Sequence, residues 1–304
     1  MKRQDGLIYK SLSGFYYVWS QGQSYTTKPK GLFRHKNEKP LVGDWVTIEI
    51  DASNPESEER LIDIAARRNQ LLRPPVANVD VALVVISLVE PDFAYNLLDG
   101  YLVSVESYGI HPVIICSKVD LMIEQKGQAA TTALLDEIEA TYAPADYTVL
   151  KTDSLEAIDA YLNETPKDTV HVVMGQSGAG KSTLLNRLIP DLAIETKDIS
   201  QSLNRGRHTT RDVTLYPSHG SWLADTPGFS AIEFPDIEAE DLAHCFPEIS
   251  RASASCKFRS CRHKQEPGCQ VKAAVEAGDI AASRYNNYLA ILERIENRKP
   301  NYRS

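Results

Sequence analysis

The sequence lacks any long uninterrupted apolar run. None of the apolar stretches among its 304 residues approaches the roughly 18 residues that a membrane-spanning helix needs. No apolar segment follows the charged start Met1–Asp5, as it would in a secretory signal peptide. We therefore expect a cytoplasmic protein with no membrane partner.

Cysteine is scarce as well. The five cysteines are an odd number, and three of them fall within the fourteen residues from 256 to 269. In a reducing compartment, such crowding favours metal binding over disulfide bonds. We expect Cys116 and Cys245 to be ordinary packed thiols.

The charge is unevenly distributed. Residues 1–75 carry 12 Lys and Arg against 9 Asp and Glu, residues 76–244 carry 10 against 26, and residues 245–304 carry 11 against 6. An acidic middle between two basic ends predicts that any contact with nucleic acid is made by the ends. The alternative is that such modest excesses only keep the surface soluble.

Residues 1–75 form the first predicted domain, a small β-barrel. Short β-prone runs alternate with turn residues there, with little helical periodicity. An OB-like barrel and an SH3-like barrel both fit this pattern. The predicted strands are Leu7–Tyr9, Phe15–Trp19, Gly31–Arg34, Trp45–Ile50 and Leu61–Ile64.

Residues 76–234 form the second predicted domain, of the α/β P-loop class. Its first strand, Val79–Ser87, is apolar at nearly every position, which is typical of a strand covered by helices on both faces. Strands and helices then alternate, as in a doubly wound sheet. The predicted helices are 94–108, 129–142 and 181–188, and the strands are Pro112–Cys116, Tyr147–Leu150 and Val170–Met174.

Residues 235–304 form the third predicted domain, which is irregular at first and then helical. We expect helices at Ala273–Ala277 and Ile280–Arg298, and the chain contains no internal repeat.

A phosphate-binding loop follows the strand Val170–Met174. The sequence matches G-x-x-x-x-G-K-[ST] at every fixed position, directly after a strand and at the start of a helix. In such a loop, backbone N–H groups surround the phosphates, Lys181 reaches the β- and γ-phosphates, and the Ser182 hydroxyl ligates Mg²⁺. The predicted nucleotide-binding residues here are Gly175, Gln176, Ser177, Gly178, Ala179, Gly180, Lys181, Ser182 and Thr183.

A base-reading loop precedes the phosphate loop. Ser117-Lys118-Val119-Asp120, after the strand Pro112–Cys116, resembles the N-K-x-D element of GTPases. Asp120 would accept from the N1–H and N2–H₂ groups of guanine, and the stem of Lys118 would lie along the base. Ser117 replaces the usual asparagine, which predicts weaker nucleotide binding rather than a different base.

Two switch elements follow the phosphate loop. Asp225-Thr226-Pro227-Gly228 fits D-x-x-G, in which Asp225 holds Mg²⁺ and the Gly228 N–H faces the γ-phosphate. In Gly206–Arg211, we favour Thr210 over Thr209 as the residue that closes over Mg²⁺. The base loop thus comes first in the chain, the reverse of an ordinary GTPase, yet loops at the carboxyl edge of a sheet converge whatever their order.

The residue after Gly228 is Phe229, which cannot orient a water molecule by hydrogen bonding. Ras-like GTPases often carry a glutamine there, so intrinsic hydrolysis is predicted to be slow without help from another group or a partner. His208 is the nearest candidate for the catalytic role, and a local or RNA-binding role for it is an equal alternative.

A metal-binding pattern lies near the C-terminal end. Cys256, Cys261, His263 and Cys269 supply three thiolates and one imidazole, which matches a closed structural zinc site with one ion per chain. The surrounding segment has few apolar residues, so zinc would contribute directly to its folding.

Taken together, these motifs resemble the RsgA (YjeQ) family over essentially the whole chain. The resemblance rests on the barrel, the permuted loops with G-R-H-T-T and D-T-P-G-F, the C-x4-C-x-H-x5-C pattern with E-P-G-C, and the helix with Arg284, Tyr285 and Tyr288. It implies a monomeric GTPase that hydrolyses GTP to GDP, is stimulated by the small ribosomal subunit and assists its late maturation. It also implies an N-terminal OB-fold and a C-terminal zinc domain that contact the ribosome and its rRNA. Lys151–Leu155 is a poor match to the S-A-K-like loop that backs the guanine.

Overall fold

The computed structural model describes residues 2–29, 33, 39–50, 59–72, 74–189, 213–225 and 237–298. The chain divides into two units whose segments interleave along the sequence. The first unit comprises Met1–Ala82, Asp159–Met174 and Lys181–Phe229, and the second comprises Leu83–Ile158, Gly175–Gly180 and Ser230–Ser304.

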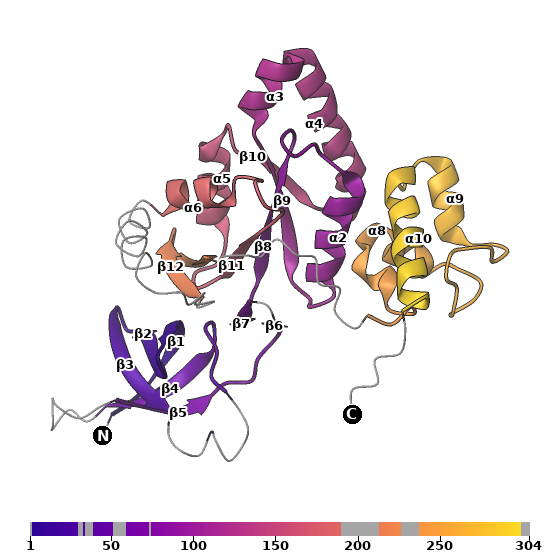
Figure 1. Cartoon of the computed structure of the whole chain (residues 1–304). Helices are drawn as coiled ribbons and strands as arrows, with labels where there is room; N and C mark the ends of the chain where they lie inside the picture. Colours follow the sequence, from indigo (N-terminus) through magenta and orange to yellow (C-terminus); the bar gives the residue numbers. More distant parts are fainter. Residues whose placement is uncertain are drawn as a thin grey trace. The chain divides into compact units, whose positions relative to one another are not determined.

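Five strands of the first unit close into a barrel (Figure 1). They are β1 (Lys2–Leu12), β2 (Phe15–Ser20), β3 (Gln23–Pro29), β4 (Trp45–Ile50) and β5 (Glu59–Ile64). Antiparallel pairs link β1 to β2 and β4, β2 to β3, and β4 to β5, while β3 and β5 pair in parallel and complete the ring. Val18, Ile48 and Leu61 are fully buried in its interior. A closed five-stranded ring of this kind agrees with the OB-like alternative.

The barrel strands differ from the sequence prediction in two places. β1 is longer than the predicted Leu7–Tyr9, because its first half, residues 2–7, pairs with β4 and its second half, residues 7–12, pairs with β2. β3 was missed because its sequence, QSYTTKP, is mostly polar. The predicted strand Gly31–Arg34 lies outside the described residues except for Phe33, which is buried.

The first unit also contains a second group of strands. β11 (Val170–Met174) pairs in parallel with β13 (Ser221–Asp225), which forms an antiparallel hairpin with β12 (Thr214–Ser218). Lys10 of β1 pairs with Thr214, so the barrel and this hairpin share one hydrogen-bonded sheet. The remaining elements are the small hairpin of β6 (Gln70–Leu72) and β7 (Pro75–Ala77), the helix α6 (Lys181–Leu188) and part of α5 (Leu155–Glu164).

The second unit is built on the strand order β10-β9-β8. β8 (Val81–Ser87), which begins at the end of the first unit, is buried at every residue. β9 (His111–Ser117) and β10 (Thr148–Lys151) pair in parallel, as expected for strands joined by helical crossovers. The helix α2 (Tyr95–Glu106) connects β8 to β9. The helices α3 (Val119–Lys126) and α4 (Gln128–Tyr142) and the short 3₁₀ helix η1 (Ala143–Ala145) connect β9 to β10.

The C-terminal helices pack against α2 within the second unit. They are η2 (Leu242–Cys245), α8 (Pro247–Ser253), α9 (Gln270–Ala277) and α10 (Ala282–Glu296). Their apolar core includes Phe246, Ile249, Val271 and Leu292, together with Val103 of α2. The C-terminal segment is therefore joined to a helix of the α/β region by a continuous core.

A buried charged cluster joins the same helices. Arg284 of α10 is fully buried and donates to Asp99 of α2 (Nη1 to Oδ1, 2.6 Å) and to Glu248 of α8 (Nε to Oε1, 2.7 Å). Asp99 also accepts from the Tyr142 hydroxyl at 2.8 Å and from the Asn287 amide at 2.6 Å. Because every charge has an oppositely charged partner, this cluster fixes how α2, α8 and α10 meet.

The predicted helices agree with α2, α4, α6, α9 and α10 within a few residues at each end. Within the described part of the chain, no helix has both the length and the apolar character of a membrane span.

Candidate nucleotide site and metal centre

The predicted phosphate loop lies between β11 and α6, in the strand–loop–helix context that its motif requires. Gly175 has φ +141°, and a Cβ built there would lie 2.0 Å from the carbonyl oxygen of Val85 in β8. Only glycine allows so close an approach, so the phosphate loop begins in contact with the backbone of β8. Ala179 N–H donates to the Gln176 carbonyl at 3.2 Å, which closes the turn.

The predicted base loop begins where β9 ends. Ser117 is the last residue of β9, and Lys118 follows with a left-handed backbone (φ 58°) before α3 starts. Asp120 lies in the first turn of α3 and is exposed. The Lys118 ammonium donates to the carbonyl of Glu90, in the segment that follows β8.

These loops touch one another inside the second unit. The buried Ser117 hydroxyl donates to the carbonyl of Ala179 in the phosphate loop at 2.6 Å. The Leu88 N–H donates to the Ser117 carbonyl at 3.2 Å. The structure therefore brings together the segments after β8 and β9 and the phosphate loop, which are far apart in the sequence.

The segment after β10 runs beside the base loop. Thr152 N–H donates to the Cys116 carbonyl at 3.0 Å, and Lys151 forms an ion pair with Glu139 at 3.0 Å. The start of Lys151–Leu155 therefore lies beside the end of β9, where the base loop begins, despite its poor match to the expected sequence.

The other predicted phosphate and magnesium residues lie in the first unit or outside the described residues. Lys181, Ser182 and Thr183 form the first turn of α6, and partial burial lowers the pKa of Lys181. Asp225 is the last residue of β13. His208, Thr210 and Gly228 lie outside the described residues.

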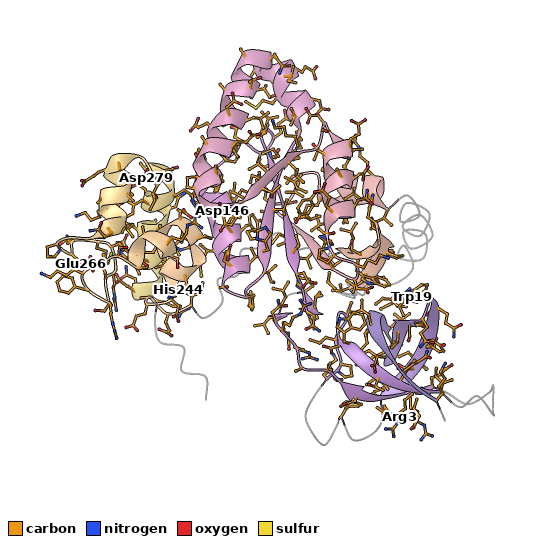
Figure 2. The ribbon with its side chains drawn as sticks, turned by 180° about the vertical axis from the view of Figure 1, so that it is seen from behind. Arg3, Trp19, Asp146, His244, Glu266 and Asp279 are labelled. Atoms are coloured by element: carbon orange, nitrogen blue, oxygen red, sulfur yellow. The ribbon has the colours of Figure 1, made fainter. Side chains whose placement is uncertain are left out.

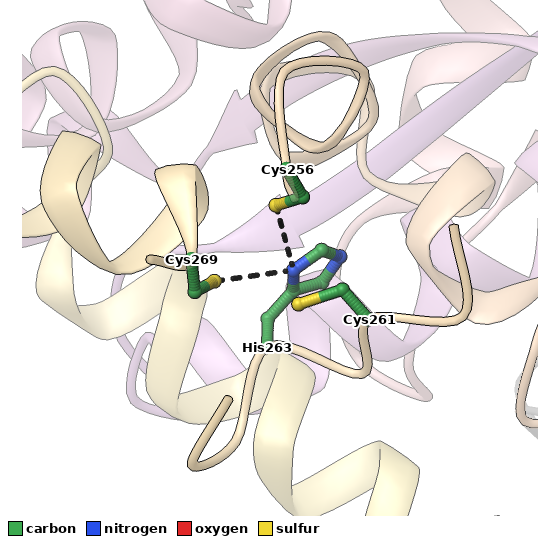
Figure 3. Close-up of side chains that lie close together, drawn as sticks. All are labelled: Cys256, Cys261, His263 and Cys269. Atoms are coloured by element: carbon green, nitrogen blue, oxygen red, sulfur yellow. Dashed lines mark hydrogen bonds between the residues drawn. The ribbon is translucent and has the colours of Figure 1, made fainter. Parts of the chain in front are cut away.

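The four predicted metal ligands converge in the C-terminal segment (Figure 3). The ligand atoms of Cys256, Cys261, His263 and Cys269 all lie within 4.8 Å of one another. Nδ1 of His263 lies 3.4 Å from Sγ of Cys269 and 3.7 Å from Sγ of Cys256. Thiolates bound to one tetrahedral zinc ion at about 2.3 Å would lie roughly 3.8 Å apart, so the donor set and its spacing fit zinc.

Residues around the cluster hold its loop in place, and sequence reasoning did not assign them this role. The Glu266 carboxylate (labelled in Figure 2) accepts from the backbone N–H groups of Arg262 and Lys264, both at 2.8 Å. The Tyr285 hydroxyl donates to the His263 carbonyl at 2.6 Å, and Gln270 N–H donates to Sγ of Cys256 at 3.3 Å. Hydrogen bonds of this kind, made to the ligand residues and their loop rather than to the metal, orient the ligands of a metal site.

Two family models match the chain. The model described as RsgA GTPase matches residues 64–235, and the model described as RsgA N-terminal domain matches residues 5–55. Together they cover most of the barrel and the region that holds both predicted nucleotide loops.

Curated relatives match over nearly the full length. The chain is 50% identical over 298 residues to the small ribosomal subunit biogenesis GTPase RsgA of Enterococcus faecalis, covering 98% of this chain and 97% of the relative. It is 47% identical over 299 residues to the protein of the same name from Streptococcus pneumoniae, with the same two coverages.

Two solved structures resemble this one. A crystal structure of YloQ, described as a circularly permuted GTPase, has a TM-score of 0.82 at 38% identity and covers 99% of this chain and 98% of that one. YjeQ from Thermotoga maritima has a TM-score of 0.81 at 30% identity, covering 98% and 100%. These similarities confirm the predicted architecture of an N-terminal barrel, a permuted P-loop region and a C-terminal Cys/His module.

Proposed function

The chain belongs to the family of RsgA GTPases and is a GTP-hydrolysing enzyme, and we propose that the small ribosomal subunit stimulates its turnover while the protein assists late maturation of that subunit. The relatives named above are GTPases of small-subunit biogenesis. The proposal extends that role to this chain and adds stimulation by the subunit.

The observation that carries the proposal is the contact between the two nucleotide loops. The hydroxyl of Ser117 reaches the carbonyl of Ala179 at 2.6 Å, although 62 positions separate them in the chain. A loop suited to guanine and a loop suited to phosphates are thereby held together, as one nucleotide requires.

We assign the nucleotide contacts by the chemistry of each residue. The guanine edge is read by Asp120, the β- and γ-phosphates are bound by Lys181, and the loop Gly175–Thr183 surrounds them. Mg²⁺, which neutralises developing charge on the phosphates, would be held by Ser182, Thr210 and Asp225, and Gly228 would face the γ-phosphate.

Catalysis requires a group that orients the attacking water. Phe229 cannot do this, and His208 is the candidate that the sequence offers nearby. If His208 is catalytic, His208→Ala abolishes the stimulated turnover while GDP binding persists, whereas full stimulated turnover by this variant would assign the role elsewhere.

The two ends of the chain are proposed to contact rRNA. Both carry excess positive charge, and each exposes an aromatic ring, Trp19 on the barrel at 39% and Phe258 in the metal-binding segment at 42%. Lys257 lies over the Phe258 ring, 5.5 Å from its centroid. Cations beside exposed rings suit unpaired RNA bases, which stack on aromatic side chains.

Three further parts of the proposal follow the sequence prediction. The domains are 1–75, 76–234 and 235–304, the four-residue Cys/His cluster holds one structural zinc ion, and the protein is a cytoplasmic monomer. Zinc would contribute folding energy to a segment with few apolar residues.

Phosphate release from GTP, measured with and without purified small subunits, tests the proposed function. We expect turnover to rise with small subunits, to stay low with large subunits, and to vanish in Lys181→Ala. Equal rates with and without small subunits would refute the proposed coupling.

A further inference from the structure

We propose that Ser117 is a positioning residue that ties the base loop to the phosphate loop and, in doing so, leaves N7 of the guanine unread. The inference rests on the proposed function, because it concerns how the same site holds its nucleotide.

The hydroxyl of Ser117 lies near two backbone carbonyls that could accept its hydrogen bond, but it has only one hydrogen to donate. Its Oγ lies 2.6 Å from the carbonyl oxygen of Ala179 and 3.2 Å from that of Ile86. A carbonyl can only accept, so the single hydrogen serves one of the two, and the shorter contact favours Ala179. Ser117 as a whole is 3% exposed, which leaves water no room to replace the bond.

Ser117 also faces Gly180 of the phosphate loop. A Cβ built on Gly180 would lie 3.9 Å from both Cβ and Oγ of Ser117, an ordinary van der Waals distance. The neighbouring backbone is fixed too, since the Ser117 carbonyl accepts from Leu88 N–H. Ser117, at the end of β9, therefore contacts both the segment after β8 and the phosphate loop.

The number of hydrogen-bond donors on the side chain at position 117 decides whether it can bind the guanine base. N7 of guanine has a lone pair and no hydrogen, so it needs a donor from the protein. The hydrogen of Ser117 is engaged with a backbone carbonyl, and its remaining lone pairs cannot bond to N7. An asparagine amide has two N–H donors, so one could hold Ala179 while the other reached the base.

Base selectivity is then left to the Watson–Crick edge. Asp120 can accept from N1–H and N2–H₂, which distinguishes guanine from adenine without any contact to N7. The site keeps its choice of base and gives up part of its affinity.

The test compares GDP with 7-deaza-GDP, in which a C–H replaces N7, by calorimetry on the full-length protein with Mg²⁺ and zinc. We expect the wild-type protein to bind both with Kd values within about twofold. Ser117→Asn should favour GDP by roughly three- to tenfold, the effect of one net hydrogen bond. Ser117→Ala should weaken both nucleotides equally, by a similar factor.

Ser107→Ala is the matched control, because the Ser107 hydroxyl also donates to a backbone carbonyl, that of Ser104 at 2.7 Å, but outside the two loops. It should leave both Kd values unchanged. A wild-type preference of tenfold or more for GDP would overturn the inference even if Ser117→Asn failed to fold. Wild-type protein that binds neither nucleotide would instead refute the proposed function.

Discussion

Asp120 lies exposed in the first turn of α3, three residues after the serine that holds its loop against the phosphate loop. A carboxylate there can accept from two donors of guanine, and an amide can accept from only one while offering an N–H. Xanthine carries an oxygen where guanine carries its amino group, so an amide suits xanthine better.

Asp120→Asn should therefore weaken GDP binding by roughly ten- to hundredfold, the loss of a charge-assisted hydrogen bond, and improve binding of xanthosine diphosphate. Competition between the two nucleotides for the purified protein measures both changes. Glu124→Gln, which removes another exposed carboxylate from α3, should change neither. Unaltered guanine preference in Asp120→Asn would remove Asp120 from the site.

His171 in β11 is a buried histidine whose two ring nitrogens make no hydrogen bond of good geometry among the described residues. Burial lowers the pKa of His171 to about 4, against the nearby backbone of Trp222 and the Asp80 carboxylate, which raise it. The unfolded chain binds this proton with a pKa of 6.5, so protonation favours unfolding as the pH falls from 6.5 towards 4.

The free energy of unfolding should accordingly be about 2 kcal/mol lower at pH 5 than at pH 7.5 because of this residue alone. Urea unfolding of wild-type protein and His171→Leu at both pH values isolates the effect. The variant should lose that part of the pH dependence while keeping the parts due to other groups. Identical pH dependence of the free energy of unfolding in both proteins would contradict the role assigned to His171.

At the scale of secondary-structure elements, Arg284 links three helices through buried charge. Its guanidinium also lies over the Phe246 ring, with Cζ 4.5 Å from the ring centroid, so Arg284 makes a cation–π contact in addition to its ion pairs. Removing it would leave Asp99 and Glu248 buried without their cation.

Arg284→Met should therefore lower the free energy of unfolding by about 3–5 kcal/mol, the usual cost of breaking a buried ion pair. Arg294→Met is the matched control, because Arg294 is an exposed cation in the same helix, and its loss should cost less than about 1 kcal/mol. Equal effects of the two substitutions in urea unfolding would show that the cluster adds nothing specific.

The segment that carries the Cys/His cluster is a second part of the chain whose stability depends on few contacts. Residues 254–269 contain no helix or strand, and they are held by Glu266, by two tyrosine hydroxyls and by the Cys/His cluster. Without zinc, three thiols and an imidazole would remain in contact with little to hold them together.

A zinc-selective chelator, with Mg²⁺ in excess, should make this segment sensitive to trypsin while GDP binding persists. Cys256→Ser should show the same cleavage without chelator, and Cys245→Ala should stay resistant because Cys245 is not a ligand. Chelated protein that resists cleavage at Lys257, Arg259 and Lys264 would argue against a structural metal.

How far the sequence predicted these elements depended on the kind of signal. The phosphate loop and β8 were predictable because motif and apolar run both reflect local chemistry. β3 could not be found from hydrophobicity, because its polar residues gain their place from pairing with β2 and β5. The roles of Ser117 and Arg284 were also beyond the sequence, since each depends on partners brought near by the fold.

At the scale of the whole molecule, chain order determines what each switch is connected to. The predicted second switch, Asp225–Gly228, is followed at Ser230 by the part of the chain that belongs to the second unit and leads to the Cys/His module. A change of order in that switch would be transmitted along the chain to the module, which is how the permuted order could couple nucleotide state to subunit binding.

The charge distribution makes a further prediction for the whole molecule. The segment 76–244 carries 16 more acidic than basic residues, so we expect an interaction with rRNA to come from the basic ends. In the segment that carries the Cys/His cluster, Lys257 and Arg259 are exposed and flank the exposed ring of Phe258. Cations that neutralise phosphates release counterions, so their loss changes the salt dependence of binding.

Replacing Lys257 and Arg259 together by alanine should weaken binding to small subunits and reduce the slope of log K against log salt by roughly one to two. Replacing Lys126 and Lys167, two exposed cations of the acidic segment, should leave the slope unchanged. Sedimentation with small subunits across a salt series measures both. If the two double variants lost the same slope, the subunit contact would not be localised to the basic C-terminal end, and the charge argument for it would fail.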